Sequence, residues 1–193
     1  CYRQTRMESN FKKIIVADNV VSKDYQNELE NFLLGNNFPW YYVSDVTESK
    51  KIDSQKRPAL CHYFVNETEV VSSYFKYIED IIVAGAGKLK LTGNIRVLLA
   101  RAFLQFPSTV KNKTLDTPHV DLKKDHLVFL YYVTDNEAET ILYSNTKPSK
   151  KMIELKKIKP KKGRMVIFNG KYYHTAKQPS KNVRCIINID ISY

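Results

Sequence analysis

The chain of 193 residues lacks the features of membrane proteins and of small disulfide-stabilised proteins. No stretch approaches the 18 consecutive apolar residues that a membrane span needs, and there are only three cysteines, Cys1, Cys61 and Cys185. An odd number of widely spaced cysteines argues against a disulfide framework and favours a reducing compartment. We therefore expect a protein with no membrane partner that works in the cytoplasm, or in the host cytoplasm if its source is a virus.

Glycine is scarce as well, with 6 residues against 13 tyrosines and 9 phenylalanines. Aromatic and β-branched residues favour strands, and a hydrophobic share of 43% is ample for a sizeable core. The length is typical of one domain, which we expect over residues 7–193. Residues 1–6 have no apolar core of a secretory signal, and we interpret them as an addition before a native start at Met7.

Negative charge is in short supply, because 20 acidic residues stand against 31 basic ones and give a net charge of +11. Between Lys147 and Arg164 there are nine basic residues and one acid, Glu154. One interpretation is a solvated lysine-rich hairpin that guards an exposed strand edge. The other is a basic rim that attracts an acidic substrate or nucleic acid. Charge alone leaves both interpretations open.

The first half of the chain mixes short strands with helices. Its predicted elements are a strand over 14–16, a helix from the N-cap Ser22 to Gly35, strands over 38–43 and 60–65, a mobile loop over 44–56, and an amphipathic helix from Val70 to Ile82 that Gly85 and Gly87 end.

From Asn94 onward the pattern is one of strands alone. We expect strands over 95–106, 127–133, 140–143, 152–158, 164–168 and 183–191, with turns between them. Short strands with a turn every ten residues or so are typical of a sandwich or jelly roll. Two helices packed on its outer face give an α+β fold, with residues 7–93 as support and 94–193 as the core.

Four residues of this second half carry the chemistry. His119 and Asp121 stand at i and i+2, so on a strand both side chains point to one face. His174 follows Asp121 by 53 residues, far enough to come from a facing strand, and Arg184 follows ten residues later. Two imidazoles and one carboxylate can occupy one face of an octahedral iron(II). An arginine behind them can grip the far carboxylate of a dicarboxylic co-substrate.

A structural role is the ordinary alternative to a metal site for residues of these types. A lone His-x-Asp or a lone histidine is more often structural, and we expect this of His62 and His126, which have no carboxylate two residues on. The joint pattern of both motifs, strand context and an arginine is much less frequent by chance. A hydrolytic zinc site also uses two histidines and one carboxylate, but the position of Arg184 argues against zinc.

An ordered set of short motifs surrounds these four residues. The set comprises Pro118-His119-Val120-Asp121, Leu130-Tyr131-Tyr132-Val133, Pro160 with Gly163, Ile167-Phe168 ahead of His174, and Arg184. In this set the chain resembles the 2-oxoglutarate/iron(II)-dependent oxygenases, in the prolyl-4-hydroxylase-like branch that includes compact bacterial and phage-type members. The resemblance is strong from Ile95 to Ser192 and less specific in the N-terminal third.

The resemblance implies a double-stranded β-helix, which is a distorted jelly roll. It implies that His119, Asp121 and His174 bind iron(II), and that the co-substrates are 2-oxoglutarate and O2, with ascorbate as an optional addition. It further implies the residues that hold 2-oxoglutarate: Arg184 on the distal carboxylate, Tyr132 as a hydrogen-bond donor to that carboxylate, and Asn188 in the same pocket. Tyr131 would then point to the opposite face of its strand.

Three features depart from the family pattern. Phe106 stands where members often have a tyrosine, so Gln105 or Arg101 has to take over its contact or the contact is absent. The loop over 108–117 is longer than in many relatives, and Ala138-Glu139 replaces a Gly-Gly pair. These departures leave iron binding intact and the substrate open.

The expected activity is hydroxylation of a C–H bond, with a prolyl or other side chain of a peptide or protein first by family similarity. An oxygenase acting on nucleic acid is the alternative that the charge favours. The demethylase branch, however, usually carries a second arginine shortly after the first, and Cys185 to Asp190 contain none. A non-catalytic binding module on the same roll is a third possibility, against which the intact triad argues.

Overall fold

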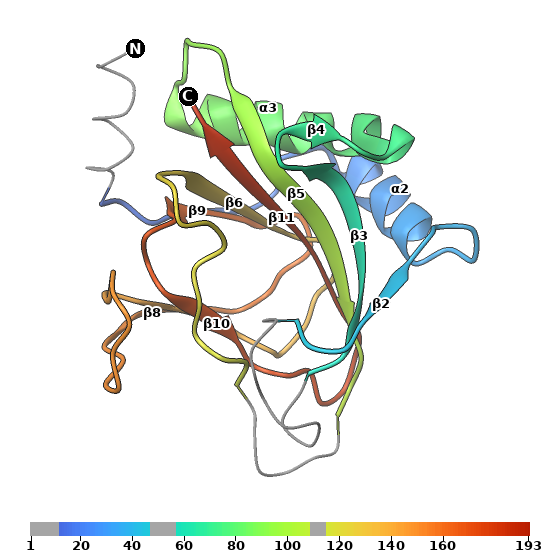
Figure 1. The fold of residues 1–193 in the computed structure, drawn as a ribbon. Helices are drawn as coiled ribbons and strands as arrows, with labels where there is room; N and C mark the ends of the chain where they lie inside the picture. Colours follow the sequence, from blue (N-terminus) through green and yellow to red (C-terminus); the bar gives the residue numbers. More distant parts are fainter. Residues whose placement is uncertain (1–11, 47–56, 109–114) are drawn as a thin grey trace.

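The computed structural model describes residues 12–46, 57–108 and 115–193 (Figure 1). A large antiparallel sheet has the spatial order β1 (Ile15–Ala17), β9 (Met165–Asn169), β6 (Leu127–Tyr132), β11 (Arg184–Ser192), β5 (Arg96–Gln105), β3 (Ala59–Asn66) and β2 (Tyr41–Val43), with β4 (Glu69–Val70) beside β3. A small antiparallel sheet has the order β10 (His174–Ala176), β7 (Thr140–Tyr143) and β8 (Glu154–Ile158). In the described residues after Asn94, the predicted pattern of strands without helices is confirmed.

The first helix, α2 (Lys23–Leu33), begins and ends where its capping signals predicted. The Ser22 hydroxyl accepts a hydrogen bond from the Tyr25 backbone N–H at 3.2 Å, which satisfies one of the unpaired donors of the first turn. Leu34 closes the helix just before Gly35. The predicted loops over 44–56 and 108–117 lie largely outside the described residues.

The prediction for the second helix is wrong at both ends. The chain first forms β4, then a 3₁₀ turn (Ser73–Ile78), and only then α3 (Glu79–Leu89). Neither Gly85 nor Gly87 ends α3, which stops at Lys90 with φ 54° in the left-handed region. Glycine inside a helix costs about 1 kcal/mol relative to alanine and is kept where packing needs it.

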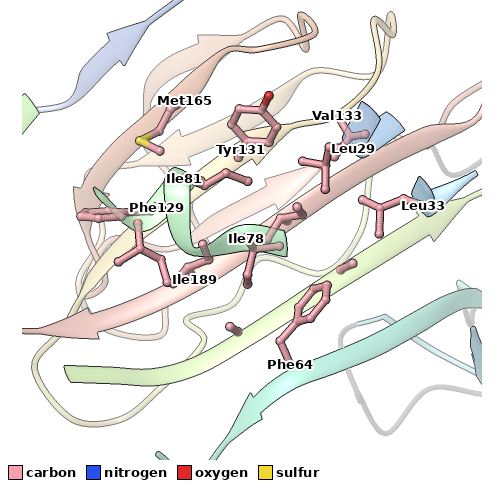
Figure 2. Close-up of a cluster of buried hydrophobic side chains, with 14 of the residues drawn as sticks. Leu29, Leu33, Phe64, Ile78, Ile81, Phe129, Tyr131, Val133, Met165 and Ile189 are labelled. Carbon is pink, nitrogen blue, oxygen red and sulfur yellow. The ribbon is translucent and has the colours of Figure 1, made fainter. Parts of the chain in front are cut away.

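Side-chain alternation along the large sheet divides the core in two. An outer core lies between the sheet and the helices, and Figure 2 shows Leu29 and Leu33 of α2 and Ile81 of α3 in the same cluster as Phe129 and Ile189 of the sheet. Both helices lie on this side of the large sheet (Figure 1).

None of the helices in the described part of the chain has the length and apolar character of a membrane span.

An inner core lies on the opposite face of the large sheet. Val128, Leu130 and Tyr132 of β6 enter it, whereas Tyr131 belongs to the outer core. Tyr131 and Tyr132 therefore point to opposite faces, as predicted. The inner face is the side on which the candidate site forms.

Candidate metal centre

The three predicted metal ligands come together through a backbone pair. The His119 N–H donates to the His174 carbonyl at 3.0 Å, and the His174 N–H donates to the His119 carbonyl at 2.9 Å. This exchange places the two imidazole centroids 4.5 Å apart. Asp121 Oδ2 lies 3.3 Å from His174 Nε2, and ligand atoms of all three residues lie within 4.8 Å of one another.

Both imidazoles have Nδ1 turned to a backbone carbonyl, which leaves Nε2 as the ring nitrogen for a metal. His119 Nδ1 lies 2.9 Å from the Thr117 carbonyl and His174 Nδ1 lies 3.4 Å from the Tyr172 carbonyl, and a nitrogen that faces a carbonyl oxygen carries the proton. Each Nε2 lone pair is therefore available. With metal–ligand bonds of about 2.1 Å, neighbouring ligands of an octahedron lie about 3.0 Å apart. The separation of Asp121 and His174 thus fits a divalent cation.

The electrostatics of the centre suit metal binding. Burial lowers the pKa of His174 to about 4, so the imidazole is neutral near pH 7, as a metal ligand has to be. Burial opposes ionisation of Asp121, but the neighbouring His174 and Arg101 outweigh it and lower the pKa of this carboxyl. Arg101 Nη2 donates to Asp121 Oδ1 at 2.8 Å, while Oδ2 has no hydrogen-bond partner among the described residues. One oxygen is thus held and the other faces the histidines.

Arg184 lines the same pocket and is 3% exposed. Its Nη1 donates to Gln105 Oε1 at 2.8 Å and its Nη2 donates to Thr140 Oγ1 at 3.0 Å. Within the described residues, the buried Nε–H has no acceptor. A buried guanidinium that keeps an unsatisfied donor fits an anionic group such as a carboxylate.

The hydroxyl of Tyr132 shares a hydrogen-bond acceptor with Arg184. It donates to Thr140 Oγ1 at 2.8 Å, and the Tyr132 side chain is completely buried. Thr140 and Arg184 line the pocket, whereas Tyr132 does not. The role predicted for Tyr132 therefore stays a prediction. Its hydroxyl bonds Thr140, which lies between it and the pocket. Asn188 does line the pocket.

The departure at Phe106 has a structural counterpart. Phe106 is 50% exposed, whereas Gln105, its neighbour on β5, lines the pocket and accepts from Arg184. Three polar residues of the pocket were not predicted from the sequence: Thr140, Thr175 and the buried Asp116. They are common residue types without a distinctive spacing, so no pattern in the sequence marks them.

The two other histidines lie outside the pocket. His62 Nδ1 bonds the Pro39 carbonyl and Nε2 bonds the Ser72 hydroxyl, both at 2.8 Å, which agrees with a structural role. His126 packs against Gly170, where a Cβ would lie 2.0 Å from its Nε2. His126 forms a second group with Asp190 and Asp121. Burial and the nearby Asp121 charge raise the pKa of Asp190, which favours its neutral form.

Solved structures, but no sequence-based comparison, give a likeness for this chain. No family model and no curated protein sequence matches the chain. Among solved structures, a 2OG-Fe(II) oxygenase family oxidoreductase from Burkholderia pseudomallei has a TM-score of 0.68 at 8% identity, over 93% of this chain and 84% of that one.

Two further structures show the range of activities on this fold. A prolyl hydroxylase from Trichoplax adhaerens, in complex with a peptide fragment of the hypoxia inducible factor oxygen degradation domain, has a TM-score of 0.62 at 12% identity, over 99% of this chain and 91% of that one. The alpha ketoglutarate dependent epimerase SnoN of nogalamycin biosynthesis has a TM-score of 0.67 at 9% identity, over 99% and 82%. At such low identities the likeness shows a shared fold, which is the jelly roll of the 2OG-Fe(II) oxygenases.

Proposed function

We propose that this chain is an iron(II)- and 2-oxoglutarate-dependent dioxygenase. The observation that carries the proposal is the convergence of His119, Asp121 and His174 in one pocket with the buried, partly unsatisfied guanidinium of Arg184. The three ligands would hold iron(II) on one face and leave three positions open. When bound, iron and 2-oxoglutarate would supply oxygen activation and C–H oxidation, with loss of carbon dioxide and formation of succinate.

The residues of the chain contribute binding, orientation and exclusion of water. Arg101 holds one oxygen of Asp121, which leaves the other for the metal. Arg184 would grip the distal carboxylate of 2-oxoglutarate, and Thr140 and Gln105 fix the plane of its guanidinium. Apolar side chains complete the wall, with Leu130, Phe168 and Ile186 lining the pocket. A pocket lining that excludes water protects the protein from side reactions of the activated oxygen.

We propose a peptide or protein side chain as the substrate, with a prolyl residue first. This choice draws on the motif resemblance and on the peptide-bound Trichoplax prolyl hydroxylase of the same fold. The likeness to an epimerase means that the fold by itself does not select hydroxylation. The substrate therefore has to be tested against a panel.

The decisive test is succinate release that depends on iron(II) and 2-oxoglutarate. We expect stimulation by a member of a proline-rich peptide panel and none by single-stranded DNA. His174→Ala and Asp121→Ala should abolish succinate formation because each removes a metal ligand. Arg184→Ala should mainly raise the 2-oxoglutarate concentration required. Full turnover by the Asp121→Ala protein would refute the metal assignment.

A further inference from the structure

An acidic residue shares the pocket with Arg184, although the proposed co-substrate is itself an anion. Asp116 is 4% exposed and lines the same pocket. An acid acting through its charge alone would oppose the binding of a dicarboxylate there. Its hydrogen bonds indicate a different role.

Two amides and one guanidinium surround the Asp116 carboxylate. Gln105 Nε2 donates to Oδ2 at 3.3 Å, and Gln178 Nε2 donates to Oδ1. Arg57 Nε lies 3.9 Å from Oδ1, so the charge of the acid is offset by a basic neighbour. The Asp116 backbone N–H donates to the Ala176 carbonyl at 2.9 Å, which fixes the position of the acid beside β10.

The contact with Asp116 fixes which way the Gln105 amide points. An amide has a donor end and an acceptor end. Because Nε2 donates to Asp116, Oε1 faces Arg184 Nη1 and accepts from it at 2.8 Å. If the amide turned over, its NH₂ group would face the guanidinium, and two donors would meet in a buried place, which is unfavourable.

We propose that Asp116, acting through Gln105, is a positioning residue that holds the Arg184 guanidinium in the orientation that receives the distal carboxylate of the co-substrate. The inference deepens the proposed function and rests on it, since the ligand is a dicarboxylate of the length of 2-oxoglutarate. Asp116 acts by hydrogen-bond direction and not by net charge. Its removal therefore weakens co-substrate binding, whereas neutralising it in the same shape does not.

Equilibrium binding tests this without turnover. Binding of 2-oxoglutarate and of glutarate is measured by calorimetry on the full chain with manganese(II), under nitrogen. Gln105→Leu removes an acceptor from Arg184, and Asp116→Leu removes the contact that fixes the direction of that acceptor. Each should raise both dissociation constants roughly tenfold. Asp116→Asn should bind within about threefold of wild type. Its one oxygen can still accept from Gln105, since the half-buried Gln178 amide can turn to meet its NH₂ group.

The matched control is Gln178→Leu, which removes the other amide from the same carboxylate and should bind within about twofold of wild type. If Asp116→Leu fails to fold, Asp116→Ala removes the same carboxylate with a smaller side chain and carries the test, with the same expected loss of binding. Tighter binding by Asp116→Asn would mean that charge dominates and would overturn the inference. So would wild-type binding by the Gln105→Leu protein. A wild-type chain that binds neither ligand would instead overturn the proposed function, and this inference with it.

Discussion

The hydroxyl of Thr140 is a junction between the arginine and the tyrosine of the pocket. Tyr132 Oη and Arg184 Nη2 both donate to Thr140 Oγ1, at 2.8 and 3.0 Å. A hydroxyl has one proton of its own, so the Thr140 proton remains available to an acceptor in the pocket. Thr140 is therefore better placed than Tyr132 to donate to a bound carboxylate.

This geometry predicts a ranking of two variants. Thr140→Val should raise the 2-oxoglutarate dissociation constant roughly tenfold, because it removes one donor and leaves Arg184 Nη2 without an acceptor. Tyr132→Phe should change that constant by less than about threefold and lower the free energy of unfolding by about 1 kcal/mol, the net value of one hydrogen bond. Calorimetric titration and urea unfolding give the two quantities. If Tyr132→Phe weakened binding more than Thr140→Val, direct contact between Tyr132 and the co-substrate would be favoured instead.

At this scale the sequence predicted ligands better than their supports. His119 and Asp121 were visible because a spacing of two fixes a common face on extended chain. Of the supporting residues, Gln105 was a candidate only through the departure at Phe106 and Thr140 was not predicted, because each acts through one hydrogen bond to a distant partner. Gln105 meets Arg184 across 79 residues, and Thr140 meets it across 44. No local pattern encodes such a pair.

The packing of α3 on the large sheet depends on a position without a side chain. At Gly85 a Cβ would lie 2.4 Å from a ring atom of Phe129, on the adjacent strand β6. At Gly87, two residues on in the same helix, a Cβ would meet nothing within 4 Å. The two glycines therefore make a matched pair inside one element.

Alanine should have opposite effects at the two positions. Gly85→Ala should lower the free energy of unfolding by about 1–3 kcal/mol, because Phe129 or the helix has to shift. Gly87→Ala should raise it by about 0.5–1 kcal/mol through helix propensity alone. Chemical denaturation of both variants measures the difference. Equal effects of the same sign would mean that α3 does not approach β6 in solution as described.

The same pair explains why the sequence misplaced the end of this helix. Two glycines within three residues favour a helix end when only local propensity is considered. Tertiary packing overrides that preference at Gly85, and the end is set by Lys90 instead. By contrast, Ser22 and Gly35 bracket α2 as predicted, because hydrogen bonds of the cap itself are local.

The basic run from Lys147 to Arg164 is not one uniform cationic surface. Arg164 and Lys161 both pair with Asp18, at 2.6 and 2.8 Å, and Lys162 pairs with Glu30. These contacts join the β8–β9 connection to the N-terminal part of the chain. Lys157 pairs with Glu154 within exposed β8. Part of the net charge of +11 therefore serves internal ion pairs, which weakens the case for a nucleic-acid surface.

The salt dependence of single-stranded DNA binding measures how many of the unpaired lysines in this run contact phosphate. Five lysines of this run have no acidic partner within 4 Å in the described part of the chain (Lys147, Lys150, Lys151, Lys156 and Lys159). At about 0.7 counterions per phosphate contact, the slope of log K against log salt should be no steeper than about −3.5. Fluorescence anisotropy at several salt concentrations gives this slope. A much steeper slope, together with DNA-stimulated succinate release, would favour the nucleic-acid alternative.

For the whole molecule, the sequence predicted the fold class but not the order of the strands. The regular spacing of strands and turns after Asn94 pointed to a jelly roll, and the structural likenesses agree with it. The pairing of β1 with β9 joins Ile15 to Ile167, which no local periodicity reveals. Sheet order depends on contacts of this kind.

The side chains of the central strand β11 face the outer core on one side and the pocket on the other. Cys185, Ile187, Ile189 and Ile191 enter the outer core, whereas Arg184, Ile186 and Asn188 face the pocket. The two faces of β11 can therefore be altered independently. An exchange at Ile186 or Asn188 changes the lining of the pocket, while the odd-numbered side chains keep the outer core packed.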